Sequence, residues 1–138
     1  MKVAVIDGQG GGIGKILVEK LKKELPNNTK VIALGTNSAA TVAMLKTGAD
    51  EGATGENAIV VNSTKVDIIV GPIGIILANS MMGELTPKMA EAISASSAIK
   101  ILVPLNKCGL EIAGVTSDAL PQNIDDAVQK AKHYCTGR

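Results

Sequence analysis

The chain has 138 residues, which is enough to form one domain that buries roughly two-thirds of the surface exposed by its unfolded state. Apolar residues make up 46% of it, but one Tyr and no Phe or Trp leave no aromatic platform for the stacked bases of a single-stranded nucleic acid. The net charge of +1, with acidic and basic residues interspersed, predicts neither a nucleic-acid partner nor an anionic membrane partner.

Cysteine usage and the distribution of charges indicate a cytoplasmic protein. The two cysteines, Cys108 and Cys135, form no CxxC pair and have no His at zinc-ligand spacing, which predicts free thiols in a reducing compartment. The sequence shows no charged-then-apolar signal segment, and glycines and a proline interrupt its longest uncharged stretch, 68–83. We therefore expect neither secretion nor a membrane span.

The first part of the chain alternates strand and helix patterns. Lys2–Asp7 is a β-branched run that ends at a glycine, and apolar residues then recur at helical spacing from Ile13 to Leu25. Lys30–Leu34 is predicted as a second strand and Ser38–Thr47 as a second helix, so that a strand–helix–strand unit is complete.

The middle of the chain is less regular. Residues 49–55 are a loop with room for a short third strand, and Glu56–Thr64 favours a helix over a strand. Val66–Val70 is a buried strand. The segment Ile75–Met82 that follows is apolar nearly all round, which predicts a helix either enclosed in the core or presented to a second subunit; we favour a homodimer contact.

The last part of the chain returns to the alternating pattern. Thr86 is expected to cap a helix from about Lys88 to Ala95, with Pro87 in its first turn. The remaining expected elements are strands over Ile99–Val103 and Glu111–Val115 and a helix over Asp118–Tyr134, whose first turn holds Pro121, Asp125 and Asp126.

This alternation predicts an α/β fold: a single three-layer Rossmann-like domain over residues 1–138 with an open, mostly parallel sheet of about five to six strands. In such a sheet the loops that follow the strands gather at one edge, where ligands bind. The residues of those loops are therefore the candidates for function.

The first of those loops is rich in glycine. Residues 8–14 contain five glycines between a strand and a helix, which leaves backbone N–H groups unobstructed at a helix N-terminus. This predicts a phosphate-binding loop; close packing of the helix on the strand is the alternative, although each glycine costs chain entropy on folding. Asp7 is expected to turn into the loop and accept its N–H groups rather than bind a metal.

Three glycine patterns can be compared with this loop. G-x-G-x-x-G fails because Ile13 stands at its last glycine, and the P-loop fails because Gln9 and Ile16 replace its first Gly and its Ser or Thr. The spacing G-x-x-x-G-I-G fits over residues 8–14, and in this respect the loop resembles the cofactor loop of short-chain dehydrogenases.

The end of the second strand does not select a nucleotide. The acidic residue that binds the ribose of NAD in Rossmann folds is absent, and Gly35, Thr36 and Asn37 stand there instead. Small polar residues suit a ribose or a 2′-phosphate. The sequence therefore does not choose between NAD, NADP and a mononucleotide. We expect NAD or NADP as the cofactor, with another nucleotide or phosphorylated small molecule as the alternative.

Further loops complete the expected site. Glu56 and Asn57 are candidates for contacting a ligand, although an ordinary helix start, with Thr54 as the cap, is equally open. Gly71 and Pro72 suit a flat ring or simply a turn, and residues 104–108 follow the fifth strand. The predicted cofactor-binding residues are Gly8, Gln9, Gly10, Gly11, Gly12, Ile13, Gly14, Thr36, Asn37, Thr54, Glu56, Asn57, Gly71 and Pro72.

The sequence shows no catalytic constellation. The Tyr–Lys pair of short-chain dehydrogenases has no counterpart, since Tyr134 is followed at that spacing by Arg138, and a single His supports neither a Ser-His-Asp triad nor a metal cluster. Whether the protein is an enzyme is left open. Its acid–base groups would come from Asp7, Lys15, Glu56, Lys107 or Cys108, where Cys108 is either an activated thiolate or a small buried residue.

Five stretches span most of the chain: VAVIDGQGGGIGK, ALGTNSAAT, GATGENAIVVN, DIIVGPIGIILANSMMGE and ILVPLN. Through them the sequence resembles a family of short bacterial proteins known only as a domain of unknown function. The resemblance implies a Rossmann-like fold and supplies no activity, substrate or catalytic residue. The alternative to nucleotide binding is a non-catalytic regulatory or interaction module that forms a homodimer through residues 75–83.

Overall fold

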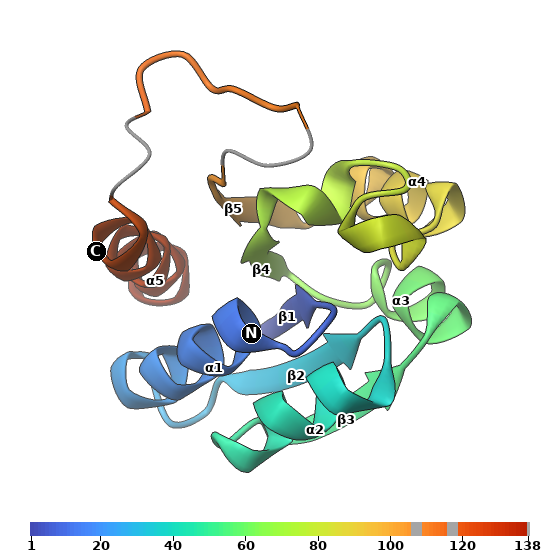
Figure 1. Cartoon of the computed structure of the whole chain (residues 1–138). Helices are drawn as coiled ribbons and strands as arrows, with labels where there is room; N and C mark the ends of the chain where they lie inside the picture. The colour runs from blue at the N-terminus through green and yellow to red at the C-terminus, as the bar shows by residue number, and fades with distance from the viewer. Residues whose placement is uncertain (106–108, 116–118, 138) are drawn as a thin grey trace.

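Strands and helices alternate along the chain in the computed structural model, which describes residues 1–105, 109–115 and 119–137 (Figure 1). The strands are β1 (Lys2–Asp7), β2 (Lys30–Gly35), β3 (Glu51–Thr54), β4 (Ile68–Pro72) and β5 (Ile99–Val103). The α-helices are α1 (Gly12–Glu24), α2 (Ser38–Lys46), α3 (Glu56–Asn62), α4 (Pro87–Ala95) and α5 (Leu120–Thr136), and two short 3₁₀ turns are η1 (Ile73–Ile76) and η2 (Met81–Gly83).

The sheet is parallel throughout and has the order β3-β2-β1-β4-β5. β1 is central: Val3 pairs with Val31 of β2 on one side and with Ile68 of β4 on the other. The chain therefore adds β2 and β3 on one side of β1, and then adds β4 and β5 on its other side. This switch point between β1 and β4 opens a crevice at the carboxyl ends of the strands, the usual ligand position in such sheets. The predicted single α/β domain is confirmed.

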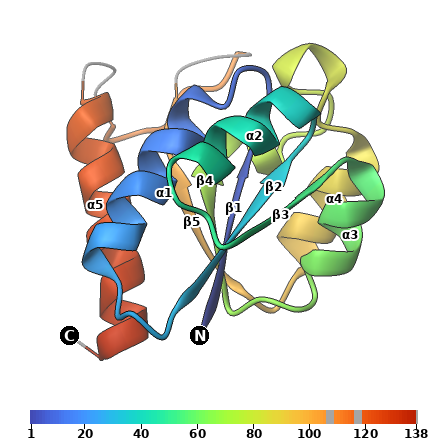
Figure 2. The same cartoon turned by 90° about the horizontal axis from the view of Figure 1, so that it is seen from below.

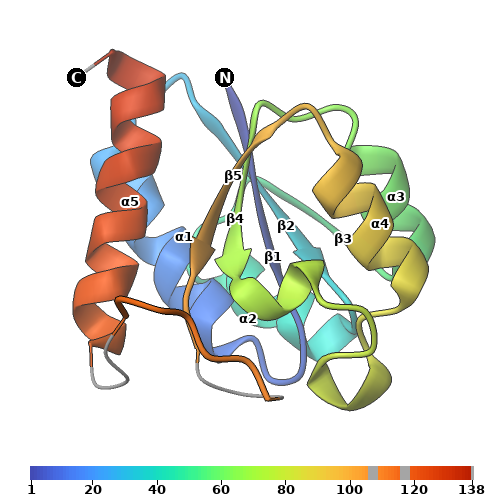
Figure 3. The same cartoon turned by 90° about the horizontal axis from the view of Figure 1, so that it is seen from above.

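Side chains of β1, β2, β4 and β5 alternate between two cores. Val3 and Val5 of β1 face the core under α1, α2 and α5, whereas Ala4 and Ile6 face the core under α3 and α4. Figures 2 and 3 show these two groups of helices on opposite faces of the sheet. Both faces of the sheet are thus covered, which explains why the strands read as nearly unbroken apolar runs. No helix in the described ranges is long and apolar enough to cross a membrane.

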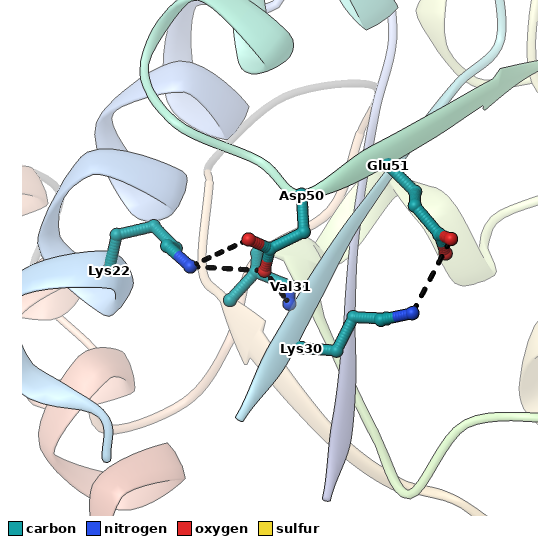
Figure 4. A network of polar contacts seen from close by, with 5 residues as sticks. All are labelled: Lys22, Lys30, Val31, Asp50 and Glu51. Atoms are coloured by element: carbon teal, nitrogen blue, oxygen red, sulfur yellow. Dashed lines mark hydrogen bonds and ion pairs between the residues drawn. The ribbon is translucent and has the colours of Figure 1, made fainter. Parts of the chain in front are cut away.

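Polar contacts fix the edge of the sheet far from the strand carboxyl ends (Figure 4). The carboxylate of Asp50 accepts a hydrogen bond from the backbone N–H of Val31 at 2.8 Å and pairs with Lys22 Nζ at 2.9 Å. Burial works to raise the pKa of Asp50, but the Val31 N–H and the Lys22 ammonium outweigh it and hold that pKa below its usual value. Lys30 pairs with Glu51 at 3.4 Å beside it. These contacts connect α1, β2 and the start of β3.

The predicted sixth strand is wrong. Gly114 adopts a left-handed conformation with φ +85°, and the N–H of Val115 donates to Ile112 O at 3.2 Å. Residues 111–115 therefore contain a turn and do not form a strand paired with β5. The described chain has five strands, the lower of the two numbers expected.

The apolar segment Ile75–Met82 is not a helix either. Asn79, Met81 and Met82 have φ values of 66°, 57° and 57°, which interrupt a right-handed helix. The last helix begins at Leu120, so Asp125 and Asp126 lie beyond its first turn, and only Pro121 of the three residues expected there is in it. The expected start at Asp118 lies outside the described residues. By contrast Thr86 caps α4 as predicted, since its Oγ1 accepts from the N–H of Met89 at 3.2 Å.

Candidate functional site

Asp7, the last residue of β1, organises the glycine loop. Its Oδ1 accepts from the N–H of Gly8 at 2.8 Å and its Oδ2 from the N–H of Gly14 at 2.7 Å, while only 5% of the residue is exposed. The carboxylate therefore turns into the loop, as the sequence predicted. Burial raises the pKa of the Asp7 carboxyl. The hydrogen bonds from backbone N–H groups lower this pKa by less, and the nearby negative charge of Glu84 raises it further.

A second carboxylate, on Glu84, closes one side of the loop. Glu84 Oε1 accepts from Gln9 N at 2.8 Å, from Thr36 Oγ1 at 2.7 Å and from Asn37 Nδ2 at 2.8 Å. The Gln9 N–H and the Thr36 hydroxyl hold the pKa of this carboxyl below its usual value. Sequence reasoning missed Glu84, and no local signal could have found it, because it lies 75 positions from Gln9.

A cavity of about 370 Å³ opens between the loop that follows β1 and the loop that follows β4. It occupies the switch-point crevice, and its volume is at the lower end of the range of small-molecule sites, about 300–1,000 Å³. Its lining is Asp7, Gly8, Gln9, Gly10, Gly12, Ile13, Pro72, Ile73, Gly74, Leu77, Ser80, Met81, Met82, Leu105 and Leu110.

Six of the predicted cofactor-binding residues therefore line one cavity: Gly8, Gln9, Gly10, Gly12, Ile13 and Pro72. The other eight do not line it: Gly11, Gly14, Thr36, Asn37, Thr54, Glu56, Asn57 and Gly71. Lys15 is exposed on α1 and is likewise absent from the lining. Lys107 and Cys108, with most of the predicted 104–108 loop, lie outside the described residues.

Four of the five predicted polar residues outside the lining have hydrogen-bond partners within the protein, namely Thr36, Asn37, Thr54 and Glu56, whereas Asn57 is exposed. Asn37 caps α2 through the N–H of Ala40 at 2.9 Å. Thr54 Oγ1 lies 2.7 Å from Thr41 Oγ1 and does not cap α3, whose N-cap is Gly55. Glu56 Oε2 accepts from Thr86 Oγ1 at 2.6 Å and so connects α3 to α4. These contacts explain the presence of these residues without a ligand.

The glycines of the site fall into two groups. A Cβ on Gly14 would lie 2.7 Å from Met44 Sδ and 2.8 Å from Asp7 Cβ, and a Cβ on Gly71 would lie 2.4 Å from Ile6 O, so close packing requires glycine at both. A Cβ on Gly10 or Gly12 would meet nothing within 4 Å, and neither residue has a positive φ. Within the described chain, nothing accepts a hydrogen bond from the N–H of Gly10 or Gly12.

The rest of the cavity is largely apolar. Ile73, Leu77, Met81 and other aliphatic side chains line it, and Asp7 is the one charged residue in the described lining. The described ranges hold no group of three or more His, Cys, Asp or Glu that could bind a metal. Two residues of the lining, Gly10 and Gly12, therefore have N–H groups without an acceptor in the described chain, beside an apolar wall. This combination suits a ligand with a small anionic end and an apolar body.

Backbone strain is concentrated at the same place. Gln9, Met81 and Met82 line the cavity and have φ values of 51°, 57° and 57°. Such conformations cost about 1–3 kcal/mol each for residues other than glycine, and they cluster at binding sites.

Comparison with known proteins identifies a family and a likeness in fold. The model of the family described as a domain of unknown function (DUF3842) matches residues 2–136. No curated protein matches the chain. Among solved structures, the chain is similar to that of a dodecameric FMN-dependent UbiX-like decarboxylase from Escherichia coli O157:H7, with 17% sequence identity and a TM-score of 0.47, over 94% of this chain and 75% of that chain.

Proposed function

The chain belongs to the family described as a domain of unknown function (DUF3842), and we propose that it binds a nucleotide or a similar phosphorylated small molecule in the cavity between β1 and β4. The phosphate accepts hydrogen bonds from the N–H groups of Gly10 and Gly12. The apolar wall that includes Ile73 and Leu77 receives the ring of the ligand.

One observation carries this proposal: Gly10 and Gly12 have no structural reason to be glycine. A Cβ at either position would meet no atom within 4 Å beyond the neighbouring backbone, and both residues line the cavity. Glycine lowers the stability of the folded chain by about 0.5–1 kcal/mol relative to alanine inside a helix, so its presence at the first residue of α1 requires another explanation. Close approach of a phosphate to the backbone supplies one.

The buried carboxyl of Asp7 is compatible with an anionic ligand. Its two oxygens accept hydrogen bonds from the N–H groups of Gly8 and Gly14, so these donors offset its charge inside the loop. NAD and NADP, which the sequence predicts, are two of the nucleotides that this proposal covers, and the proposal assigns no reaction.

Thermal unfolding with NAD, NADP, FMN, FAD, ATP and GTP tests the proposal. A ligand at 100 times its dissociation constant adds about 2.7 kcal/mol to the free energy of unfolding and raises the midpoint. We expect at least one of these compounds to do so.

The Gly12→Leu variant identifies the site. Leucine is a good helix former and places bulk in the cavity, so the variant should fold and lose the ligand-induced rise. Ala39→Leu, in the exposed first turn of α2, is the matched control and should keep it. An equal rise in both variants would remove the glycine loop from the site, and no rise with any compound would contradict the proposal.

A second candidate function is the interaction module that pairs through residues 75–83. The observation in its favour is Met82, which exposes 95% of its surface beside the cavity. Ile75 of the same stretch is fully buried, so any contact between copies depends on the tip of the segment.

A further inference from the structure

We infer that the ligand is a mononucleotide and that the protein excludes dinucleotides. This inference rests on the proposed function and concerns the half of the crevice on the β2 side. There the protein's own segment 77–85 occupies the place that the second half of a dinucleotide needs.

A dinucleotide crosses the glycine loop of a doubly wound sheet, and one of its riboses reaches the end of the second strand. In this protein the donors at that point are already used. The hydroxyl of Thr36, the amide of Asn37 and the N–H of Gln9 all donate to Glu84 Oε1, at 2.7–2.8 Å. A ribose could reach them only by displacing the Glu84 carboxylate.

The space at the end of β2 between Gly8, Thr36 and Glu84, called the corner below, is also closed sterically. A Cβ on Gly8 would lie 2.5 Å from Thr36 Oγ1, 2.7 Å from Met81 Sδ and 3.1 Å from Glu84 Oε1, so that even a methyl group does not fit. At Gly10 and Gly12, by contrast, nothing lies within 4 Å. The open space therefore lies on the β4 side of the loop, in the cavity of about 370 Å³.

The segment 77–85 is anchored at both ends. Ser80 Oγ donates to Gly74 O at 2.5 Å, and Asn79 N donates to Leu85 O at 2.7 Å. Leu85 is fully buried in the core under α3 and α4, and Ser80 is only 5% exposed. Moving Glu84 and Met81 out of the corner breaks these contacts as well as the three hydrogen bonds to Glu84. The closed corner is therefore a stable part of the fold.

Matched pairs of ligands test the inference. FMN is compared with FAD, and nicotinamide mononucleotide with NAD, by isothermal titration calorimetry on the full chain. In each pair the two compounds share the phosphorylated half and differ by the added adenosine monophosphate. We expect the mononucleotide of at least one pair to bind about tenfold or more tightly than its dinucleotide, which is 1.4 kcal/mol or more. Equal or tighter binding of the dinucleotide in every pair that binds would overturn the inference and leave the proposed function standing.

Opening the corner should remove the discrimination. Met81→Ala and Glu84→Ala each take away one part of the closure, and we expect each to tighten dinucleotide binding several-fold relative to mononucleotide binding. Glu91→Ala, which removes an exposed carboxylate from α4, is the control and should leave the ratio unchanged. If Glu84→Ala fails to fold, Met81→Ala still decides, because it keeps every hydrogen bond of Glu84.

The failures can be told apart. Discrimination that persists unchanged in folded variants would show that segment 77–85 is not its cause and would overturn the inference alone. Absence of binding by all four compounds, together with no effect of Gly12→Leu on unfolding in the presence of any nucleotide, would overturn both the proposed function and the inference.

Discussion

At the scale of single residues, two carboxylates hold the glycine loop and have opposite preferences for protons. Asp7 lies inside the loop, where burial raises its pKa, and Glu84 lies outside it, where hydrogen bonds from Gln9 and Thr36 lower its pKa. The difference in pKa follows from their surroundings. Asp7 is buried away from water, whereas Glu84 is partly exposed and accepts three hydrogen bonds.

This difference predicts how stability depends on pH. Because the folded state raises the pKa of Asp7 above its ordinary 3.8, the stability that Asp7 contributes is present below pH 3.8 and is lost as the pH rises through the raised pKa. Urea unfolding of the wild type and of Asp7→Asn, repeated across acidic and neutral pH, should show the wild type losing stability relative to the variant as the pH rises.

Glu84→Gln is the internal comparison for that experiment. The pKa of Glu84 is lowered from 4.5, so its contribution is present above pH 4.5 and is lost as the pH falls through the lowered pKa. The two variants should therefore differ from the wild type with opposite slopes. The same slope for both would contradict the assignment of Asp7 as the buried carboxyl that resists ionisation.

Gly12 gives the second prediction at this scale. Replacement by alanine adds a Cβ that meets no protein atom within 4 Å and reduces the freedom of the unfolded chain. We expect Gly12→Ala to raise the free energy of unfolding by about 0.4–1 kcal/mol, measured by urea titration without ligand. A loss of stability would mean that the fold itself requires glycine at position 12, which would contradict the functional explanation of this residue.

At the scale of elements, glycine also sets how closely strands and helices approach. Gly71 of β4 lies against the backbone of β1, where a Cβ would be 2.4 Å from Ile6 O. Gly14 of α1 lies against side-chain atoms of Met44 and Asp7. A backbone oxygen in a central strand cannot move aside. At Gly14 the thioether of Met44 can, which leaves Asp7 Cβ at 2.8 Å as the remaining contact under 3 Å.

Gly71→Ala should therefore destabilise the protein more than Gly14→Ala does. We expect both losses within the range of about 1–3 kcal/mol found for overpacked cores, with Gly71→Ala in its upper part. Denaturant unfolding of both variants measures the order. If Gly14→Ala proves the more damaging, the hydrogen bond from its N–H to Asp7, and not the sheet spacing, is the more sensitive feature.

Elements governed by local signals were predictable from the sequence. β1 ends at Asp7, before the glycines, and α4 begins after Thr86, at Pro87, where short-range propensities change. The segment 75–82 was mispredicted because its shape depends on distant contacts: Ile75 and Leu85 enter the core, and the residues between them form a closed loop. Apolar composition alone does not distinguish such a loop from a buried helix.

At the scale of the whole molecule, the same limit applies to the candidate site. Parallel topology makes it predictable that loops after the strands meet at one edge, and the glycines at 10 and 12 do line a cavity there. Which half of that edge is open was not predictable. It depends on Glu84 and Met81, which reach Gln9 and Gly8 only through the fold.

Self-association is the remaining prediction at this scale. If two copies pair through residues 75–83, Met82 must supply much of the apolar contact, because it is 95% exposed while Ile75 is fully buried. A lysine at that position would place a charge in the interface and should weaken the dimer about tenfold or more, which corresponds to 1.4 kcal/mol.

Sedimentation velocity of the wild type and of Met82→Lys at micromolar concentrations measures this weakening of the dimer. Val61→Lys, at a 39% exposed position on α3, is the control and should sediment as the wild type does. A wild-type protein that stays monomeric throughout would contradict pairing through this segment, and would leave Met82 as an exposed rim of the cavity, available to a bound ligand and not to a second subunit.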